Sequence, residues 1–162
     1  MMISKGKILQ IHRFVARALE LAPPTTFPGV VQILDWAIMR VEQNQARDDA
    51  YPCIFARGAE LFYFISSIRP FSRYNQLTAL CVVDWWLRRQ SLGLKEVSLD
   101  DLQVMTERIR RDYRDPLLQA CDCFAQEYRY WFFMHSQPNG EHDAGSAGAI
   151  RSMSRTFANL SW

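Results

Sequence analysis

"SSIRPFSRYNQLTAL", residues 66–80, lies between two strongly apolar stretches of the chain. "CIFARGAELFYFISSI", residues 53–68, leads into it, and "LTALCVVDWWLRRQSLG", residues 77–93, leads out of it. Each stretch is apolar enough and long enough to be a buried helix. This part of the chain therefore predicts two buried helices joined by a short loop. The second helix is expected to end near Gly93, with Arg88 and Arg89 in its last turn, where positive charge suits the helix dipole.

The sequence before this helix pair also has helical spacing. A first helix is predicted from Ser4 to Leu21, because apolar residues recur at Ile8, Ile11, Val15 and Leu19. "APPTTFPG", residues 22–29, breaks the pattern with three prolines and a glycine. "VVQILDWAIMRVEQ", residues 30–43, restarts it, and a polar loop, "NQARDDAYP", residues 44–52, follows. The second apolar stripe consists of Val30, Leu34, Ala37, Ile38 and Val41.

Two further helices are predicted after Gly93. Ser98 and Asp101 have the pattern of an N-cap and an acidic third position for a helix over residues 99–113. Asp115 and Pro116 similarly open a helix that continues to residue 136. Four bulky aromatic residues of the predicted helices are expected to be mostly in the core, because a small helical domain needs such side chains. They are Trp85 and Trp86 before Gly93, and Trp131 and Phe132 after it.

The chain therefore predicts an all-α domain over residues 1–136, a flexible linker over 137–149 and a C-terminal tail segment over 150–162. The linker, "QPNGEHDAGSAGA", is rich in glycine and polar residues and has no apolar anchor. Two interpretations stay open for the tail: a short helix that docks back, or a segment that becomes ordered on a partner. Its apolar residues have helical spacing at Ile150, Met153, Phe157 and Leu160.

Length and composition limit the class of protein. The 162 residues are 49% hydrophobic and 13% aromatic, which is typical of a globular domain rather than a disordered chain. A net charge of +2 is too small to indicate nucleic acid, and no apolar run reaches the roughly 18–20 residues of a membrane span. The basic start also fits a mitochondrial targeting helix, but its apolar spacing favours a first packed helix. The four cysteines form no C-x-x-C pair and have no histidine at ligand spacing, which predicts reduced thiols in a cytoplasmic protein: Cys53, Cys81, Cys121 and Cys123.

The loop itself has the composition of an anion site. The first N–H groups of the helix that follows are unpaired and attract anions. Asn75 can cap that helix or touch a phosphate, and Arg69 and Arg73 add positive charge. The alternative is that both arginines are solvated or pair with an acid such as Glu60, and spacing alone favours this second interpretation.

"YPCIFARGAELFYFISSIRPFSRYNQLTALCVVDWWLRRQSLGL", residues 51–94, resembles the central part of the Fic/Doc (Fido) family, and in particular its death-on-curing (Doc) branch. That family has the motif H-P-F-x-D-G-N-K-R-T-A across a helix–loop–helix. "IHRFVARAL" resembles its first helix, and "PGVVQILDWAI" resembles its flap segment and the helix after it. The resemblance implies a Fic/Doc-like helical bundle around the central helix–loop–helix, with room for a small flap hairpin. Matches to the central motif stand at Pro70, Phe71, Asn75, Thr78 and Ala79, and Gly58, Ala59 and Leu61 match the family's A-A-x-L pattern upstream.

The departures from the motif remove the family's reactive groups. Arg69 stands where the resemblance places a general-base histidine, and an arginine stays protonated. Arg73 replaces the acidic residue that would hold magnesium. Tyr74 replaces a small residue, and Gln76 and Leu77 replace the basic pair that clamps phosphates. Loss of the base alone typically removes roughly two to four orders of magnitude of rate.

Two hypotheses follow for function. The first is a catalytically degenerate Fic/Doc-like protein that binds or regulates another protein, with an antitoxin-like helix as the partner that the resemblance implies, no cofactor and no metal. The alternative is an enzyme of altered chemistry, which transfers a phosphoryl or nucleotidyl group to a protein side chain. There Arg69, Arg73 and Asn75 would hold a nucleotide, with or without magnesium.

The remaining polar residues favour no other chemistry. His12 is expected in the core or on the surface rather than in catalysis, and His135 and His142 have no evident acid partner. Asp84 lies too deep in its helix to serve the loop. Nucleic-acid binding is disfavoured, because acidic residues are interleaved with Arg108, Arg111 and Arg114.

Overall fold

The structure of the chain is a computed structural model that describes residues 3–19, 28–47, 54–95, 101, 104–105, 107–108 and 130–138. The described part is mostly helical, as predicted. Its elements are α1 (Lys5–Ala18), α2 (Val30–Arg47), α3 (Ile54–Ile68), α4 (Asn75–Arg88), β1 (Leu92–Leu94) and β2 (Ser136–Pro138). Residues 130–134 are helical as well.

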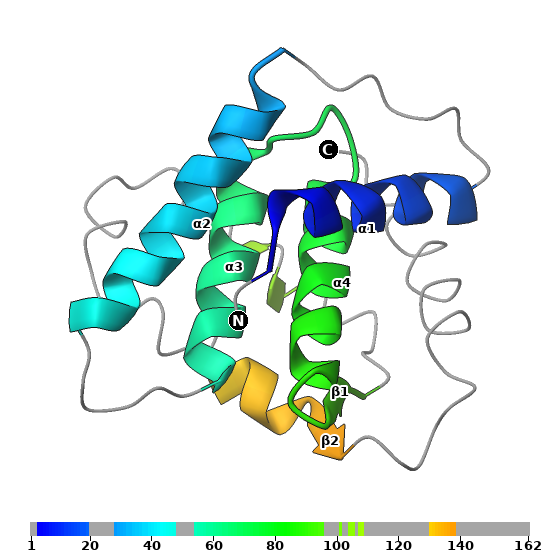
Figure 1. The fold of residues 1–162 in the computed structure, drawn as a ribbon. Coiled ribbons are helices and arrows are strands. Elements are labelled where there is room, and N and C mark those ends of the chain that lie inside the picture. The colour runs from blue at the N-terminus through cyan, green and yellow to red at the C-terminus, as the bar shows by residue number, and fades with distance from the viewer. Residues whose placement is uncertain are drawn as a thin grey trace.

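The helix pair predicted around the loop forms the centre of the domain. α3 and α4 lie side by side and are joined by the loop at one end (Figure 1). α1 crosses α4 near that end, α2 lies along the outer side of α3, and the small sheet lies at the opposite end. α1 therefore lies close to the loop end of the helix pair (Figure 1).

Close packing between α3 and α4 depends on a glycine. A Cβ atom added at Gly58 would lie only 3.2 Å from Val83 Cγ1 and 4.0 Å from Trp86 Cδ1. The same end of the pair is joined by a hydrogen bond, because Trp86 Nε1 donates to the carbonyl oxygen of Ile54 at 3.1 Å. Trp86 is 2% exposed, so its ring is buried in the core while its Nε1–H keeps a hydrogen-bond partner.

Most of the predicted core residues are buried. On α1, Ile8, Ile11 and Val15 are buried, and Ser4 is the N-cap, with its side chain accepting a hydrogen bond from the Lys7 N–H. The apolar stripe of α2 is buried as predicted, except that Ile38 is half-buried. Trp85 and Trp131 are also half-buried, whereas Trp86 and Phe132 are fully buried.

The predicted end of the helix after the loop is wrong. α4 ends at Arg88, and Gly93 lies in β1, which pairs antiparallel with β2. Ser91 has a positive φ of 58°, which turns the chain out of the helix. The Asp84 carboxylate then holds the turned segment, because it accepts hydrogen bonds from the Leu94 N–H at 2.9 Å and from Arg88 Nε at 2.7 Å.

Other predicted boundaries also change. α1 ends at Ala18 instead of continuing to Leu21, and Ser136, predicted to be the last residue of a helix, lies in β2. α2 continues to Arg47, so the first residues of the predicted polar loop are helical. Gln137 and Pro138, predicted to begin the linker, belong to β2 instead. They pair with β1, which lies more than forty residues earlier in the chain. Pairing between such distant segments cannot be predicted from the local sequence. The sheet is also not the flap hairpin that the family resemblance implies, because neither strand comes from the segment that resembles the flap.

The predicted helix caps at Ser98, Asp115 and Pro116, the rest of the linker and the tail segment lie outside the described residues. Within the described ranges, the structure has no helix with the length and hydropathy needed to cross a membrane.

Replacing Asp84 by alanine is expected to lower the free energy of unfolding by about 2 kcal/mol, because the half-buried Leu94 N–H loses a charged acceptor. Urea denaturation of the full chain measures this. Asp35 is the matched control: it pairs with Lys5 at 2.7 Å but is well exposed, so Asp35→Ala should cost at most about 0.5 kcal/mol. Equal losses in the two variants would contradict the anchoring role of Asp84.

Candidate functional site

The loop between α3 and α4 makes its reversal with two residues in the left-handed region. Arg69 has φ 52° and Tyr74 has φ 61°, although neither is glycine. Tyr74 occupies the N-cap position of α4, and no side chain caps the helix there. The Tyr74 carbonyl oxygen accepts from the Thr78 N–H at 2.8 Å, so the helix begins immediately after the turn.

Asn75 braces the loop with both ends of its side-chain amide. Its Oδ1 accepts from the Phe71 N–H at 2.9 Å, and its Nδ2 donates to the Phe71 carbonyl oxygen at 2.8 Å. The sequence suggested a helix cap or a phosphate contact for this residue. In the structure its amide binds the Phe71 backbone, and no side chain caps α4. The one polar residue that the loop shares with the Fic/Doc motif is engaged within the loop itself.

Phe71 is held from its other side by His12 of α1. The two rings are stacked, with centroids 3.7 Å apart and an interplanar angle of 8°. His12 Nδ1 lies 2.9 Å from Thr78 Oγ1 in a hydrogen bond whose direction depends on the tautomer. Among the described residues, His12 Nε2 has no hydrogen-bond partner.

His12 is a core histidine, the first of the two places, core or surface, that the sequence left open. Its side chain is 1% exposed, and burial lowers its pKa to about 4. It is therefore neutral at pH 7 and is shielded from solvent. A neutral imidazole is the right species for a general base, but a base must reach the proton that it removes. This one is buried beneath Phe71, so it has no access to a substrate in this arrangement.

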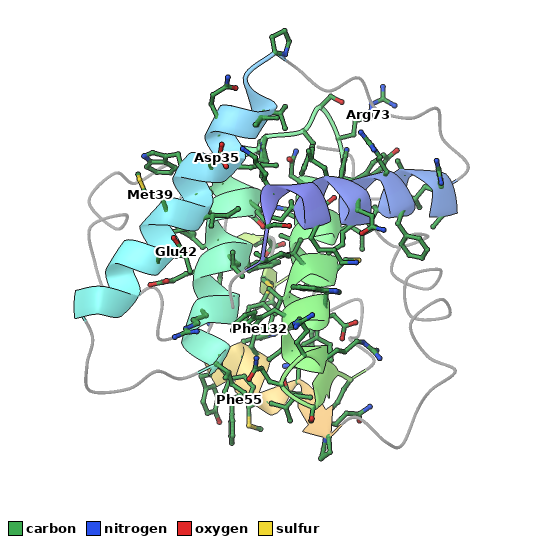
Figure 2. The ribbon with its side chains drawn as sticks, viewed as in Figure 1. Asp35, Met39, Glu42, Phe55, Arg73 and Phe132 are labelled. Atoms are coloured by element: carbon green, nitrogen blue, oxygen red, sulfur yellow. The ribbon has the colours of Figure 1, made fainter. Side chains whose placement is uncertain are left out.

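The other residues of the degenerate motif divide into exposed and buried sets. Arg69 and Arg73 are exposed, and Figure 2 shows Arg73 projecting from the loop away from the helices. Tyr74 is half-buried and packs against the core. The buried set consists of Pro70, Phe71, Gln76 and Leu77. Gln76 and Leu77, where the Fic/Doc resemblance would place a phosphate clamp, are thus buried.

The structure gives His135 an acid neighbour that the sequence did not reveal. His135 Nε2 lies 3.6 Å from Asp101 Oδ2, its Nδ1 hydrogen-bonds the Trp131 carbonyl oxygen at 2.8 Å, and its ring stacks on Trp131. The expectation that His135 lacks an acid partner is therefore wrong, because residues 34 positions apart meet only after folding. These contacts hold β2 and the helical turn before it, at the end of the domain opposite the loop. His142 lies outside the described residues.

The described cysteine is unsuited to nucleophilic chemistry. Burial, with a smaller contribution from the Asp84 carboxylate, raises the pKa of Cys81 to about 12, so the thiolate that would react is absent at neutral pH. The described part of the chain contains no group of three or more histidine, cysteine or acidic side chains able to hold a metal ion. Cys53, Cys121 and Cys123 lie outside the described residues.

A second feature, on α2, was not predicted from the sequence. Ile33, Trp36 and Met39 are 37%, 44% and 43% exposed. They follow one another at three-residue spacing on a side of α2 that the core stripe does not use. Figure 2 shows Met39 pointing away from α3. We call these three residues the outer α2 surface.

The outer α2 surface continues onto α3 and has an acidic border. The Trp36 ring meets Phe64 of α3 edge to face, with centroids 5.7 Å apart. Asp35 and Glu42 lie about one turn before and one turn after Met39, and both are exposed. The sequence contained a signal for this surface, since a helix with apolar residues on two faces has more of them than one core can bury.

Compared with family models, with curated proteins and with solved structures, the chain matches none.

Proposed function

We propose that the chain is a Fic/Doc-like helical protein without catalytic activity, and that it binds another protein in the cytoplasm. The outer α2 surface is the observation that carries this proposal. Exposed tryptophan and methionine side chains are enriched where proteins bind one another. Three large apolar residues in one row on a helix are suited to bind an apolar helix face, and an antitoxin-like helix is the partner class that the resemblance implies.

The state of the loop supports the same proposal. Arg69 stands at the position of the general base, and the side chain of Asn75 is occupied by the backbone of Phe71. His12, the described histidine that contacts the loop, stacks on Phe71 and is buried. The described loop residues and His12 thus offer no accessible base.

A photo-crosslinking amino acid at position 36 tests the proposed binding surface. The expected result is one predominant crosslinked protein, which then binds the purified chain saturably. Trp36→Ala should weaken that binding by about 30-fold, as expected for a tryptophan at the centre of an interface. Phe14→Ala is the matched control, because Phe14 is an equally exposed aromatic residue on α1 and should not affect affinity. Equal affinity of the Trp36→Ala variant and the unmodified chain would contradict the proposal.

The altered-chemistry enzyme is a second candidate, favoured by the exposed Arg69 and Arg73 next to the start of α4. Thermal unfolding with millimolar ATP or GTP, with and without magnesium, distinguishes it from the first. A nucleotide present at 100 times its Kd would stabilise the chain by about 2.7 kcal/mol. We expect no such shift.

A shift would favour the enzyme if the Arg69→Ala, Arg73→Ala variant lost it. The Arg13→Ala, Arg17→Ala variant is the matched control, because it removes two exposed arginines from α1 and leaves the loop unchanged. A shift lost in both variants would indicate charge attraction without a site at the loop.

A further inference from the structure

We propose that His12, Phe71 and Asn75 form an acid-opened latch, which keeps the loop between α3 and α4 closed until His12 takes up a proton. We call these three residues the loop latch. It is separate from the outer α2 surface and operates whether or not a partner is bound.

Phe71 is the central residue of the loop latch. Its ring is 4% exposed and stacks on His12 of α1, while its backbone N–H and carbonyl are both bound by the Asn75 amide. Thr78, three residues after Asn75 on α4, hydrogen-bonds His12 at 2.9 Å. The first turn of α4 therefore makes two contacts in the loop latch. Asn75 binds the backbone of Phe71, and Thr78 binds the imidazole nitrogen of His12. Release of either contact removes one of the two supports of the loop.

Protonation of His12 is incompatible with the closed arrangement. A second ring proton has to go either to the nitrogen that faces Thr78 or to Nε2, and Nε2 has no partner among the described residues. A cation at a site that is 1% exposed loses its hydration and gains no carboxylate in return. Burial is accordingly the cause that lowers the pKa of His12 to about 4.

Charged and titratable groups on the surrounding elements do not offset this cost. The neighbours of His12 on its own helix are apolar at Ile8, Ile11, Val15 and Ala16, while the arginines of α1 are exposed. On α4, the Asp84 carboxylate is bound by Arg88 and the Leu94 N–H. The full set on the elements around the loop latch is Lys5, Lys7, Arg13 and Arg17 on α1, Arg57, Glu60 and Tyr63 on α3, Arg69, Arg73 and Tyr74 in the loop, and Cys81, Asp84 and Arg88 on α4. None of them contributes to the lowered pKa of His12.

Opening the loop latch changes what the loop presents to solvent. The Asn75 amide is freed from Phe71, at the start of α4, where the first N–H groups of the helix are unpaired. Arg69 and Arg73 stand two residues before and two residues after Phe71, and both are exposed. The closed loop of neutral pH thus becomes a polar, cationic loop in acid.

Hydrogen exchange of the Phe71 amide tests the proposal, because that N–H donates to Asn75 only while the loop latch is closed. The ¹⁵N-labelled full chain is measured between pH 6.0 and 4.5, with protection corrected for the intrinsic pH dependence of exchange. His12 titrates near 6.5 when the loop is open and near 4 when it is closed. Protection at Phe71 should therefore fall by about 20-fold over this range, while core amides such as Leu61 and Leu80 stay protected.

His12→Phe is the control, since it keeps a stacking ring and removes the titration. Its Phe71 protection should be independent of pH. The proposal is overturned if Phe71 in the unmodified chain keeps its protection at pH 4.5, if it loses protection together with Leu61 and Leu80, or if His12→Phe shows the same fall.

Discussion

Trp86→Ala is expected to lower the free energy of unfolding by about 4 kcal/mol, the loss typical of truncating a buried tryptophan. Trp86 is 2% exposed and packs where α3 and α4 come closest, next to Gly58. Truncation leaves a large cavity between the two helices. It also leaves the Ile54 carbonyl oxygen without the donor that Trp86 provides. Urea denaturation of the full chain, followed by circular dichroism, measures the loss.

Two variants separate the causes of this loss. Trp36→Ala removes the same side chain from a 44% exposed position, so its cost should stay below about 1 kcal/mol. Trp86→Phe fills most of the cavity and removes the hydrogen bond to Ile54, with an expected cost of about 2 kcal/mol. If Trp36→Ala proved as destabilising as Trp86→Ala, the assignment of the core to the α3–α4 pair would be wrong.

Acidification is expected to destabilise the chain through His12 by up to about 3 kcal/mol between pH 7 and pH 4. The folded-state pKa of about 4 lies below the ordinary value of 6.5, so the unfolded chain binds a proton first as the pH falls. The contribution of neutral His12 to stability is therefore complete above pH 6.5 and is lost as the pH falls from 6.5 to 4. The loss is smaller than this limit if the loop latch opens first, because an open loop lets His12 take up its proton without global unfolding.

Comparison with His12→Phe isolates this effect from the carboxylates that titrate in the same range. The stability of the unmodified chain should fall more steeply with decreasing pH than the stability of the variant. The difference should develop between pH 6.5 and 4 and be absent from pH 7 to 8. Parallel pH profiles for the two proteins would show that His12 is not buried as a neutral imidazole.

Helical periodicity was sufficient to predict the elements that make up the scaffold. The stripes Ile8–Ile11–Val15 and Val30–Leu34–Val41 predicted α1 and α2 with their buried faces, because a helix buries residues three and four positions apart. Two long apolar stretches around Pro70 predicted α3, α4 and the loop between them. The proposed likeness to the Fic/Doc family comes from the same segment and stays a prediction.

Contacts between distant segments decided the rest. The sequence does not show that Asp84 binds the Leu94 N–H, and so it placed Gly93 in a helix rather than in β1. His135 and Asp101 likewise meet only in the folded chain. The exposed apolar side of α2 was not predicted, because helical periodicity shows which residues share a face of the helix. It does not show which of these faces another element covers.

The sequence by itself determined that the chain is mostly helical, where its central helices lie, and that the loop between them lacks a base and an acidic metal ligand. Only the tertiary structure decided what the loop residues do. Asn75 binds the Phe71 backbone, and α1 places His12 against the Phe71 ring. A side chain's type limits the bonds that it can make, but the partner is chosen by packing, which brings together residues more than fifty positions apart.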